Sequence, residues 1–379
     1  MIETDDRTTD QRQLWSRCWA SASGFWCGPL AWTAWTLAGS LIAIVLLQLY
    51  VQYQFNYWNR DFFDALERRD AVALRYAAWL LVPLCTSSIA LAVVSVWGRM
   101  TTQRKWREWL TTHVIRYWLE NGRYLRLAQV HGEHKIPEYR IAEDARVATD
   151  APIDFVLGLL SSLLTAIIFI QILWNVGGDF VMTAFGYTVW IPGYLVVSVV
   201  LYSGLVTGAM LFVGAPLVKV IRGKDQTEAE LITAAHSLRD VGEGVSPQRD
   251  EPKVQRGLWA ALESALAQWR GLCWQLMRTT VVSHSNFLLA PIIGLVLCAP
   301  KFLAGTMTLG ELTQAAAAFT LVQSSFNWLV DNYGRVADWV SSVDRVGALL
   351  VALDQLNHSG QSVSRNGARL TSTPVKPIP

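Results

Sequence analysis

The chain has 379 residues, of which 52% are hydrophobic and only 16% are charged. A soluble globular protein carries roughly a quarter charged residues, so this composition excludes an ordinary soluble protein. The 32 Lys and Arg residues nearly balance the 30 Asp and Glu residues, which excludes the strongly basic surface of a nucleic-acid-binding protein. We therefore expect a membrane protein whose partners include lipid but no nucleic acid.

Six apolar segments follow one another along the chain, each close to the twenty or so residues that cross a bilayer as a helix. They cover residues 30–55, 76–98, 152–174, 188–214, 279–300 and 309–330. Helices are the expected form, because lipid offers no partner to an unpaired backbone group. The fifth and sixth segments contain Pro291, Pro300 and several polar residues, so we expect them to face protein rather than lipid.

The links between these segments are unequal in length and in charge. Residues 99–151 and 215–278 form two long links whose helical spacing predicts extensions beyond the bilayer. They carry 10 and 9 Lys or Arg residues, whereas the short link 175–187 carries none. The positive-inside rule therefore places both long links and both termini in the cytoplasm, most simply that of a bacterium with this protein in its inner membrane.

These patterns define the expected domains and fold class. Residues 1–29 form a cytoplasmic N-terminal segment, 30–356 an all-α domain of six transmembrane helices with long cytoplasmic helical extensions, and 357–379 a tail. The tail is rich in Ser, Thr, Gly and Pro, a composition typical of disorder.

Several short motifs indicate a family. They read WNRDFFDAL at 58–66, WREWLT at 106–111, YRIAED at 139–144, GTMTLGELTQ at 305–314 and ADWVSSVDRV at 337–346. In order and spacing they resemble the transmembrane domain of ABC exporters, namely the bacterial transporters related to the SbmA/BacA peptide transporters and the peroxisomal fatty-acyl half-transporters. The resemblance covers about residues 30–356. It implies a homodimer that moves a peptide-like or amphipathic substrate, driven by an ATPase.

The sequence departs from that family in two places. It contains no G-x-x-x-x-G-K-[ST] loop and no LSGGQ-like segment, so we expect the chain not to hydrolyse ATP by itself. After the fourth segment, Ile232 replaces an arginine that the family carries, and Gly242, Gly244 and Pro247 loosen the helix.

Three functions remain open at this point. The chain is the permease half of an ABC transporter with a separate ATPase subunit, or a stand-alone proton-driven importer of the SbmA/BacA type, or a non-transporting membrane scaffold. A proton-driven importer needs carboxylates within the membrane, and Glu311 and Asp331 are the candidates.

Polar residues inside apolar segments are costly in lipid and often mark a substrate path. The candidates for a substrate path or for proton coupling are Gln171, Asn175, His284, Glu311, Gln314, Gln323, Asn327, Asp331 and Asn332. The alternative for Glu311 and Asp331 is that both lie at the ends of the span, in water.

Two further groups lie at the ends of the segments. The external-mouth motif comprises Trp58, Asn59, Arg60, Asp61 and Asp64, which form either a gate or a structural ion pair with aromatic anchors. The cytoplasmic coupling candidates are Arg140, Glu143, Asp144, Glu230, Arg239 and Glu243, which either touch an ATPase or form a solvated charged face.

No cofactor is expected. His131 and His134 stand three residues apart in a loop over Gly132, which lacks the helical H-E-x-x-H spacing of a zinc site. We therefore expect no metal and no enzymatic active site.

Overall fold

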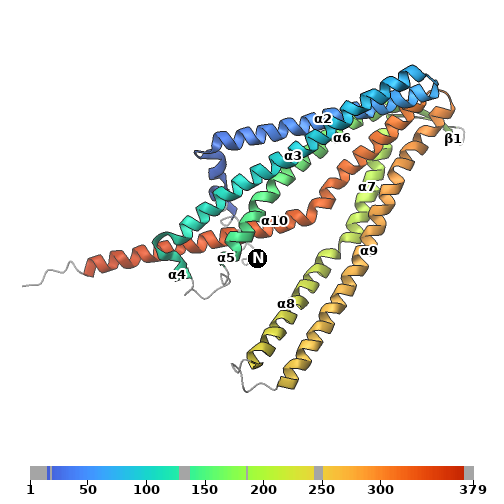
Figure 1. The fold of residues 1–379 in the computed structure, drawn as a ribbon. Coiled ribbons are helices and arrows are strands. Elements are labelled where there is room, and N and C mark those ends of the chain that lie inside the picture. Colours follow the sequence, from blue (N-terminus) through green and yellow to red (C-terminus); the bar gives the residue numbers. More distant parts are fainter. Residues whose placement is uncertain (1–14, 18, 128–136, 185–186, 243–250, 371–379) are drawn as a thin grey trace, which may run out of the picture. The chain divides into compact units, whose positions relative to one another are not determined.

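The computed structural model describes residues 15–17, 19–127, 137–184, 187–242 and 251–370, and long helices make up most of it (Figure 1). The longer helices are α2 (Ala31–Glu67), α3 (Ala71–Leu119), α6 (Ala145–Gly177), α7 (Tyr194–Gly214), α8 (Leu217–Gly242), α9 (Glu251–Leu303) and α10 (Leu309–Leu370). The shorter elements are η1 (Glu120–Gly122), α4 (Arg123–Leu127), α5 (Pro137–Tyr139), the π-helical turn η2 (Arg140–Asp144), β1 (Asp179–Ala184) and β2 (Tyr187–Pro192). Residues 15–17 and 19–27 are also helical and are called the N-terminal segment below.

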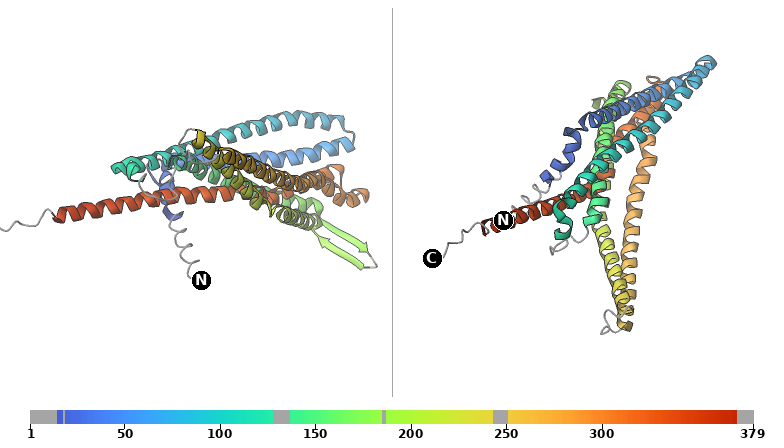
Figure 2. Two further views of the ribbon diagram at one scale, coloured as in Figure 1. Left: turned by 90° about the horizontal axis from the view of Figure 1, so that it is seen from below. Right: turned by 60° about the vertical axis from the view of Figure 1, so that its left-hand side comes forward.

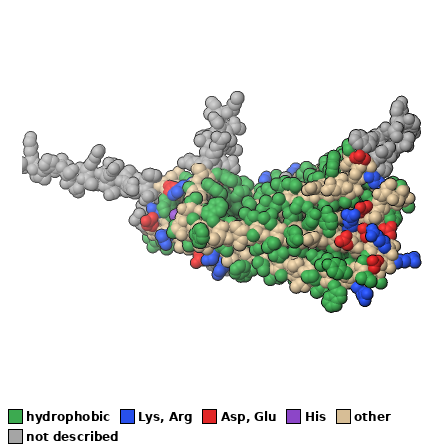
Figure 3. Space-filling model, turned by 90° about the horizontal axis from the view of Figure 1, so that it is seen from above, with side chains coloured by type: hydrophobic (Ala, Val, Ile, Leu, Met, Phe, Trp, Pro, Cys, Tyr) green, Lys and Arg blue, Asp and Glu red, His purple; other side chains and the backbone are tan. Residues whose placement is uncertain are grey.

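Five stretches of helix are long and apolar enough to cross a membrane, namely α2, α3, η2 with α6, α7 with α8, and α9. This finding, over the described residues, confirms the predicted all-α membrane fold with helical extensions. On the face shown in Figure 3, hydrophobic side chains predominate and charged side chains gather in groups. The sixth predicted span begins α10 but is less apolar than the other five, so the count of six stays a prediction.

Burial explains why the first part of α10 tolerates polar residues. Ala315, Ala318, Phe319 and Val322 are fully buried, so this helix faces protein, as predicted for the sixth segment. Large apolar side chains of α9 such as Phe287 are exposed in this single chain, so the expectation that the fifth segment also faces protein stays a prediction. Pro291 and Pro300 lie inside α9, which continues through both.

The fourth predicted span needs a correction at its start. Residues 179–192 form an antiparallel hairpin in which Val181 pairs with Trp190, and helix α7 begins only at Tyr194. Gly193 adopts a left-handed φ of 60°, and a Cβ there would lie 2.4 Å from the Trp174 ring. A glycine at this junction is therefore required on both conformational and steric grounds.

The chain divides into two units, each described here by itself. Unit 1 comprises residues 1–58, 72–165 and 331–379, and unit 2 comprises 59–71 and 166–330. In unit 1, α3 buries Gly98, Thr102, Trp106, Leu110 and Val114, one residue every four, which is the stripe of a helix that packs on one side.

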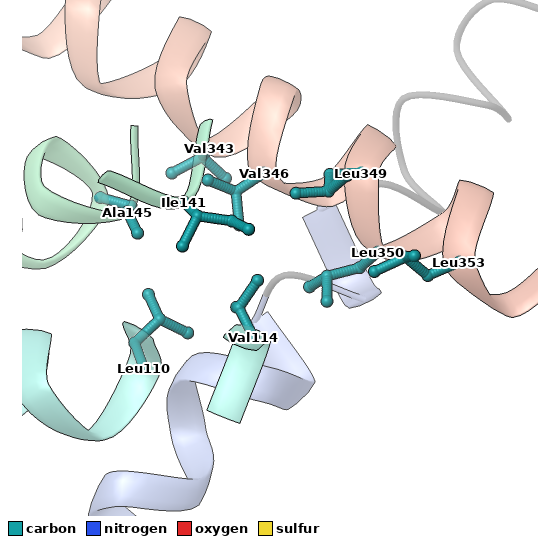
Figure 4. Packing of buried hydrophobic residues seen from close by; sticks show 10 residues of the cluster. Leu110, Val114, Ile141, Ala145, Val343, Val346, Leu349, Leu350 and Leu353 are labelled. Atoms are coloured by element: carbon teal, nitrogen blue, oxygen red, sulfur yellow. The ribbon is translucent and has the colours of Figure 1, made fainter. Parts of the chain in front are cut away.

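Two hydrophobic clusters form the core of unit 1. In the first, Trp106 and Leu41 pack with Phe25 of the N-terminal segment and Ile153 of α6. The second joins α3, η2, the start of α6 and α10 (Figure 4). Its buried members from α10 are Val343, Val346, Leu349, Leu350 and Leu353. The far part of α10 is therefore held by apolar packing in unit 1.

In unit 2, α8 lies beside the first part of α9 (Figures 1 and 2). Trp269 donates its indole N–H to Glu228 at 2.8 Å, and the Lys224 ammonium lies 5.1 Å from the Trp269 ring. The predicted helical link 215–278 is thus confirmed for the described residues. Residues 243–250 lie outside them.

The predicted tail also differs from the structure. Helix α10 continues to Leu370, although disorder is predicted from residue 357. Proline does not appear in this stretch until Pro374, so no residue before that point forbids a helix. Residues 371–379 lie outside the described part of the chain.

Candidate functional site

The start of α10 is a complete N-terminal cap. The Thr308 hydroxyl accepts a hydrogen bond from the Glu311 backbone N–H at 3.2 Å. The Glu311 carboxylate in turn accepts one from the Thr308 N–H, also at 3.2 Å. This reciprocal pattern is a capping box, which satisfies backbone donors that have no partner inside the helix.

Two carboxylates near the end of α2 complete that cap. Glu67 accepts a hydrogen bond from the Leu309 N–H at 2.9 Å, and Asp64 accepts one from the Gly310 N–H at 2.9 Å. Together with Thr308, they satisfy three consecutive backbone donors at a helix end that attracts negative charge. Glu67 is not among the sequence-based candidates, although its place directly after the 58–66 motif was a signal.

Arg60 lies between these acidic groups. Its guanidinium contacts the Glu311 carboxylate at 2.9 Å and the Asp64 carboxylate at 3.9 Å. The motifs at 58–66 and 305–314, which are about 250 residues apart, are therefore bound to each other. These contacts favour the structural alternative for Arg60 and Asp64 over a mobile gate.

Gly310 has no room for a side chain. A Cβ there would lie 2.2 Å from the Arg60 carbonyl oxygen and 2.4 Å from the Asp64 carboxylate. The close approach of the two chain segments therefore requires glycine at this position.

The other members of the external-mouth motif do not join this contact. Asp61 is exposed, Asn59 is half-buried, and the Asn59 side-chain oxygen has no hydrogen-bond partner among the described residues. Trp58 belongs to unit 1, where its indole N–H donates to the Ala77 carbonyl at 2.7 Å.

Further along α10, polar side chains are buried within unit 2. Gln314 is 0% exposed and Gln323 is 2% exposed, and Asn327 is half-buried four residues later. The Gln323 amide nitrogen and the Asn327 side-chain oxygen have no partner within the described part of the chain. Buried amides of this kind bind water or solute when space allows.

Most of the remaining path candidates are exposed. Gln171, Asn175 and His284 are exposed, and the His284 ring stacks on Phe287 at 6.0 Å. Asp331 is exposed, and Asn332 accepts a long hydrogen bond from Arg335 at 3.4 Å.

A polar contact that the candidates omit joins α7 to α9. The Tyr202 hydroxyl donates to the Asn286 side-chain oxygen at 3.1 Å, and the Tyr202 ring lies 5.8 Å from the Phe319 ring of α10. Asn286 stands two residues from His284, so polarity within the fifth segment was the available signal.

Among the coupling candidates, Asp144 has the strongest contacts. Its carboxylate is almost fully buried and accepts hydrogen bonds from Arg345 at 2.7 to 3.0 Å. The motifs at 139–144 and 337–346 are thereby joined within unit 1. Arg140 lies half-buried in the same π-helical turn, a feature that often marks functional segments.

The other coupling candidates lie nearer to solvent. Glu143 pairs with Arg146 at 2.5 Å, and this hydrogen bond lowers the pKa of the Glu143 carboxyl. On α8, Glu230 is exposed and accepts a hydrogen bond from Gln226 at 3.1 Å, and Arg239 is exposed. Glu243 lies outside the described residues.

One charged cluster of unit 1 has no counterpart in the sequence-based candidates. Asp354 of α10 accepts hydrogen bonds from Arg17 at 2.6 and 2.9 Å and one from the Tyr117 hydroxyl. Burial opposes ionisation of Asp354, but the hydrogen bonds outweigh it and hold the pKa of this carboxyl below its usual value. The Arg123 guanidinium lies 4.0 Å from the Tyr117 ring.

A second missed residue is Asp154 of α6, also in unit 1. It pairs with Arg335 at 2.7 Å and with Arg99 at 3.5 Å, and it accepts a hydrogen bond from Gln103 at 2.8 Å. A carboxylate inside a predicted span was the signal that could have found it. No group of residues suited to hold a metal ion occurs among the described residues.

Long apolar helices that carry buried polar side chains define a multi-pass membrane protein of the transporter class. Comparison with known proteins gives the family: residues 26–303 match the ABC transporter transmembrane region 2. The chain therefore belongs to this family.

Known relatives agree with that assignment. The inner membrane ABC transporter ATP-binding protein YddA of Escherichia coli is 28% identical over 333 residues, which cover 85% of this chain and 58% of that protein. The ABC transporter D family member 2, chloroplastic, of Arabidopsis thaliana is 22% identical, with coverage of 92% and 47%. An uncharacterized ABC transporter ATP-binding protein of Synechocystis is 23% identical, with coverage of 85% and 47%. The chain thus spans about half the length of these relatives.

Proposed function

We propose that this chain is the substrate-conducting membrane half of an ABC-type transporter, and that an ATP-binding domain outside residues 1–379 drives it. The observation that carries this proposal is the burial of Gln323 in α10, where its amide nitrogen has no partner among the described residues, within a segment predicted to cross the membrane. Burying such an amide is unfavourable unless it binds something. A solute path that opens and closes beside α10 would supply a polar partner for it.

We further propose that the solute is peptide-like or amphipathic and that the working unit is a homodimer, as the resemblance to the SbmA/BacA-related and peroxisomal transporters implies. The names of the relatives from Escherichia coli and Synechocystis describe those proteins as ATP-binding, which supports an ATPase partner. Residues 1–379 contain no phosphate-binding loop, so ATP hydrolysis belongs to that partner.

We also propose a bacterial inner-membrane location with both termini in the cytoplasm. The distribution of Lys and Arg supports this orientation, and the Escherichia coli relative is named as an inner membrane protein. In this orientation, Arg60 and Glu311 meet at the external side.

A stand-alone proton-driven importer is the second candidate function. It needs carboxylates that change protonation during transport. Glu311 is bound to Arg60 and caps α10, so its role in the contacts described above is structural. Asp331 remains, but it is exposed at the end of the segment. The structural contacts of Glu311 and the exposure of Asp331 therefore support the ATP-driven alternative.

Uptake of a labelled peptide by cells that express the chain tests these alternatives. For an ATP-driven transporter, we expect uptake to stop when ATP is depleted while the proton gradient is kept, and to survive an uncoupler when ATP is kept. The opposite pattern supports the proton-driven importer. Lack of uptake in every condition, for peptides and for other amphipathic solutes, supports the scaffold alternative.

The path itself is tested by cysteine substitution along residues 311–332. We expect positions beside Gln314 and Gln323 to react with a hydrophilic thiol reagent in the membrane. Uniform protection along this stretch contradicts a water-filled path.

A further inference from the structure

A cavity of about 360 Å³ lies in unit 1 between the N-terminal segment, the start of α2 and the part of α3 beyond the predicted span. Its volume falls within the range of about 300 to 1,000 Å³ that is common for ligand sites. None of the polar side chains of α10 described above lines it.

The cavity has one apolar wall and one charged wall. Phe25, Leu30 and Trp109 contribute apolar surface, while Lys105 and Arg116 contribute cationic groups. Neither Lys105 nor Arg116 has an ion-pair partner among the described residues, where the ion pair of α3 is made by Arg99. Two cations without ion-pair partners in one lining favour an anion.

Two further residues of the lining, Glu108 and His113, carry ionisable side chains. Glu108 supplies one carboxylate, and His113 lies with its ring stacked on Trp109 at 5.4 Å. Burial, followed by the positive charges of Arg17 and Arg116, lowers the pKa of His113. Lys105 and Arg116 are opposed by Glu108 alone, so these three side chains leave the lining with a net positive charge.

The cavity lies where the chain enters its first predicted span. Leu30 and Thr33 line it and stand at the start of the predicted span 30–55, whereas Lys105 and Arg116 belong to the extension of α3 beyond 76–98. An amphiphile with an apolar body and an anionic head fits this arrangement. Basic pockets beside transmembrane helices bind the headgroups of acidic lipids in this way.

We propose that this cavity binds the phosphate headgroup of an anionic phospholipid of the surrounding leaflet, with the positive charges of Lys105 and Arg116 attracting the headgroup and the acyl chains beside Phe25 and Leu30. The bound lipid ties the N-terminal segment to α3 at the membrane surface. This inference depends only on the membrane location of the chain and not on its substrate.

Native mass spectrometry of the full chain in detergent tests the site, with phosphatidylglycerol and phosphatidylcholine of the same acyl chains as probes. We expect phosphatidylglycerol to bind more tightly. Lys105→Gln and Arg116→Gln should each weaken its binding roughly fivefold, since a cation near an acidic lipid contributes about 1 kcal/mol, which equals that factor. Binding of phosphatidylcholine should not change.

Three control variants separate charge from structural damage. Arg104→Gln removes the neighbouring charge on α3 outside the cavity, and should leave binding unchanged. Lys105→Arg keeps the charge and should keep the affinity. Glu108→Gln removes the opposing carboxylate and should tighten binding, a change of sign that damage to the fold cannot produce.

Three results overturn the proposal. The first is equal binding of the two lipids by the unaltered chain, and the second is equal loss of affinity in Arg104→Gln and Lys105→Gln. The third is displacement of phosphatidylglycerol by an excess of inorganic phosphate, which would assign the cavity to a soluble anion. Since Arg116 is exposed, the Arg116→Gln variant keeps the test open if Lys105→Gln fails to fold.

Discussion

Arg60 binds Glu311 at 2.9 Å across 251 positions of sequence. This contact joins the end of α2 to the start of α10, and Glu311 also takes part in the cap of α10. The same carboxylate was a candidate for proton coupling, so variants that separate charge from capping decide between the two roles.

Glu311→Ala removes both the ion pair and the capping acceptor. We expect the free energy of unfolding to fall by about 1 to 2 kcal/mol, combining the usual effects of a lost cap and a part-exposed ion pair. Glu311→Gln keeps an oxygen that can accept a hydrogen bond from the Thr308 N–H, so the free energy of unfolding should fall by less than about 1 kcal/mol. Thermal unfolding in detergent measures both. Uptake that persists in Glu311→Gln agrees with a structural role, whereas loss of uptake at unchanged stability supports proton coupling.

Gly310→Ala places a methyl group against Arg60 and Asp64. We expect the free energy of unfolding to fall by about 1 to 3 kcal/mol, because the clash forces the two segments apart. The clash also weakens the hydrogen bond from the Gly310 N–H to Asp64. Gly334→Ala on the same helix is the matched control, since a Cβ there meets nothing within 4 Å. Gly334→Ala should raise the free energy of unfolding by about 0.5 to 1 kcal/mol. Equal effects of the two substitutions would contradict the close approach at Gly310.

Asp354 gives the stability of the protein a specific pH dependence. Because its pKa is lower in the folded chain than the value of about 3.9 in an unfolded chain, its contribution is present above pH 4. It is lost as the pH falls through the folded pKa. Asp354→Asn should therefore lower stability by about 1.5 to 3 kcal/mol at pH 7, the usual value of hydrogen bonds to a charged group.

The deficit of this variant should shrink as the pH falls below 4 towards the folded pKa of Asp354. Unfolding curves at pH 7 and pH 3, with Asp225→Asn on the exposed surface of α8 as control, measure this decrease. A deficit that is as large at pH 3 as at pH 7 would show that Asp354 acts by packing rather than by charge.

Gln323→Leu separates transport from stability. The amide nitrogen of Gln323 is buried without a described partner, so an apolar side chain of similar size should leave the free energy of unfolding unchanged or raise it by up to about 1 kcal/mol. Uptake should fall at least roughly tenfold, the effect of losing one contact of about 1.4 kcal/mol in the path. Ser324→Ala, at the exposed neighbouring position, should change neither. Unaltered uptake in Gln323→Leu would remove α10 from the path.

Much of the fold follows from periodicity and composition alone. The apolar segments and the stripe through Trp106, Leu110 and Val114 depend on neighbours three or four residues away, and the structure confirms both. The hairpin at 179–192 was not predicted, because β-branched and apolar residues such as Val181 and Val189 also suit a transmembrane helix. Gly178 and Gly193, on either side of it, were the local signal for a break.

The candidate site was harder to predict than the fold. Arg60, Asp64 and Gly310 stood out in short motifs, but their mutual contacts depend on folding across roughly 250 residues. The contact of Asp144 with Arg345 spans 201 positions, and the contact of Arg17 with Asp354 spans 337. Side-chain types indicated which residues matter, and only the three-dimensional arrangement revealed their partners.

The cap on α10 has a consequence for biosynthesis. Asp64 and Glu67 are translated 246 and 242 residues before the backbone N–H groups that they bind. While the ribosome is still synthesising α9, the carboxylates at the C-terminal end of α2 lack the backbone partners that they bind in the folded protein. A nascent chain that stops before Thr308 therefore leaves this end of α2 without its contacts to α10.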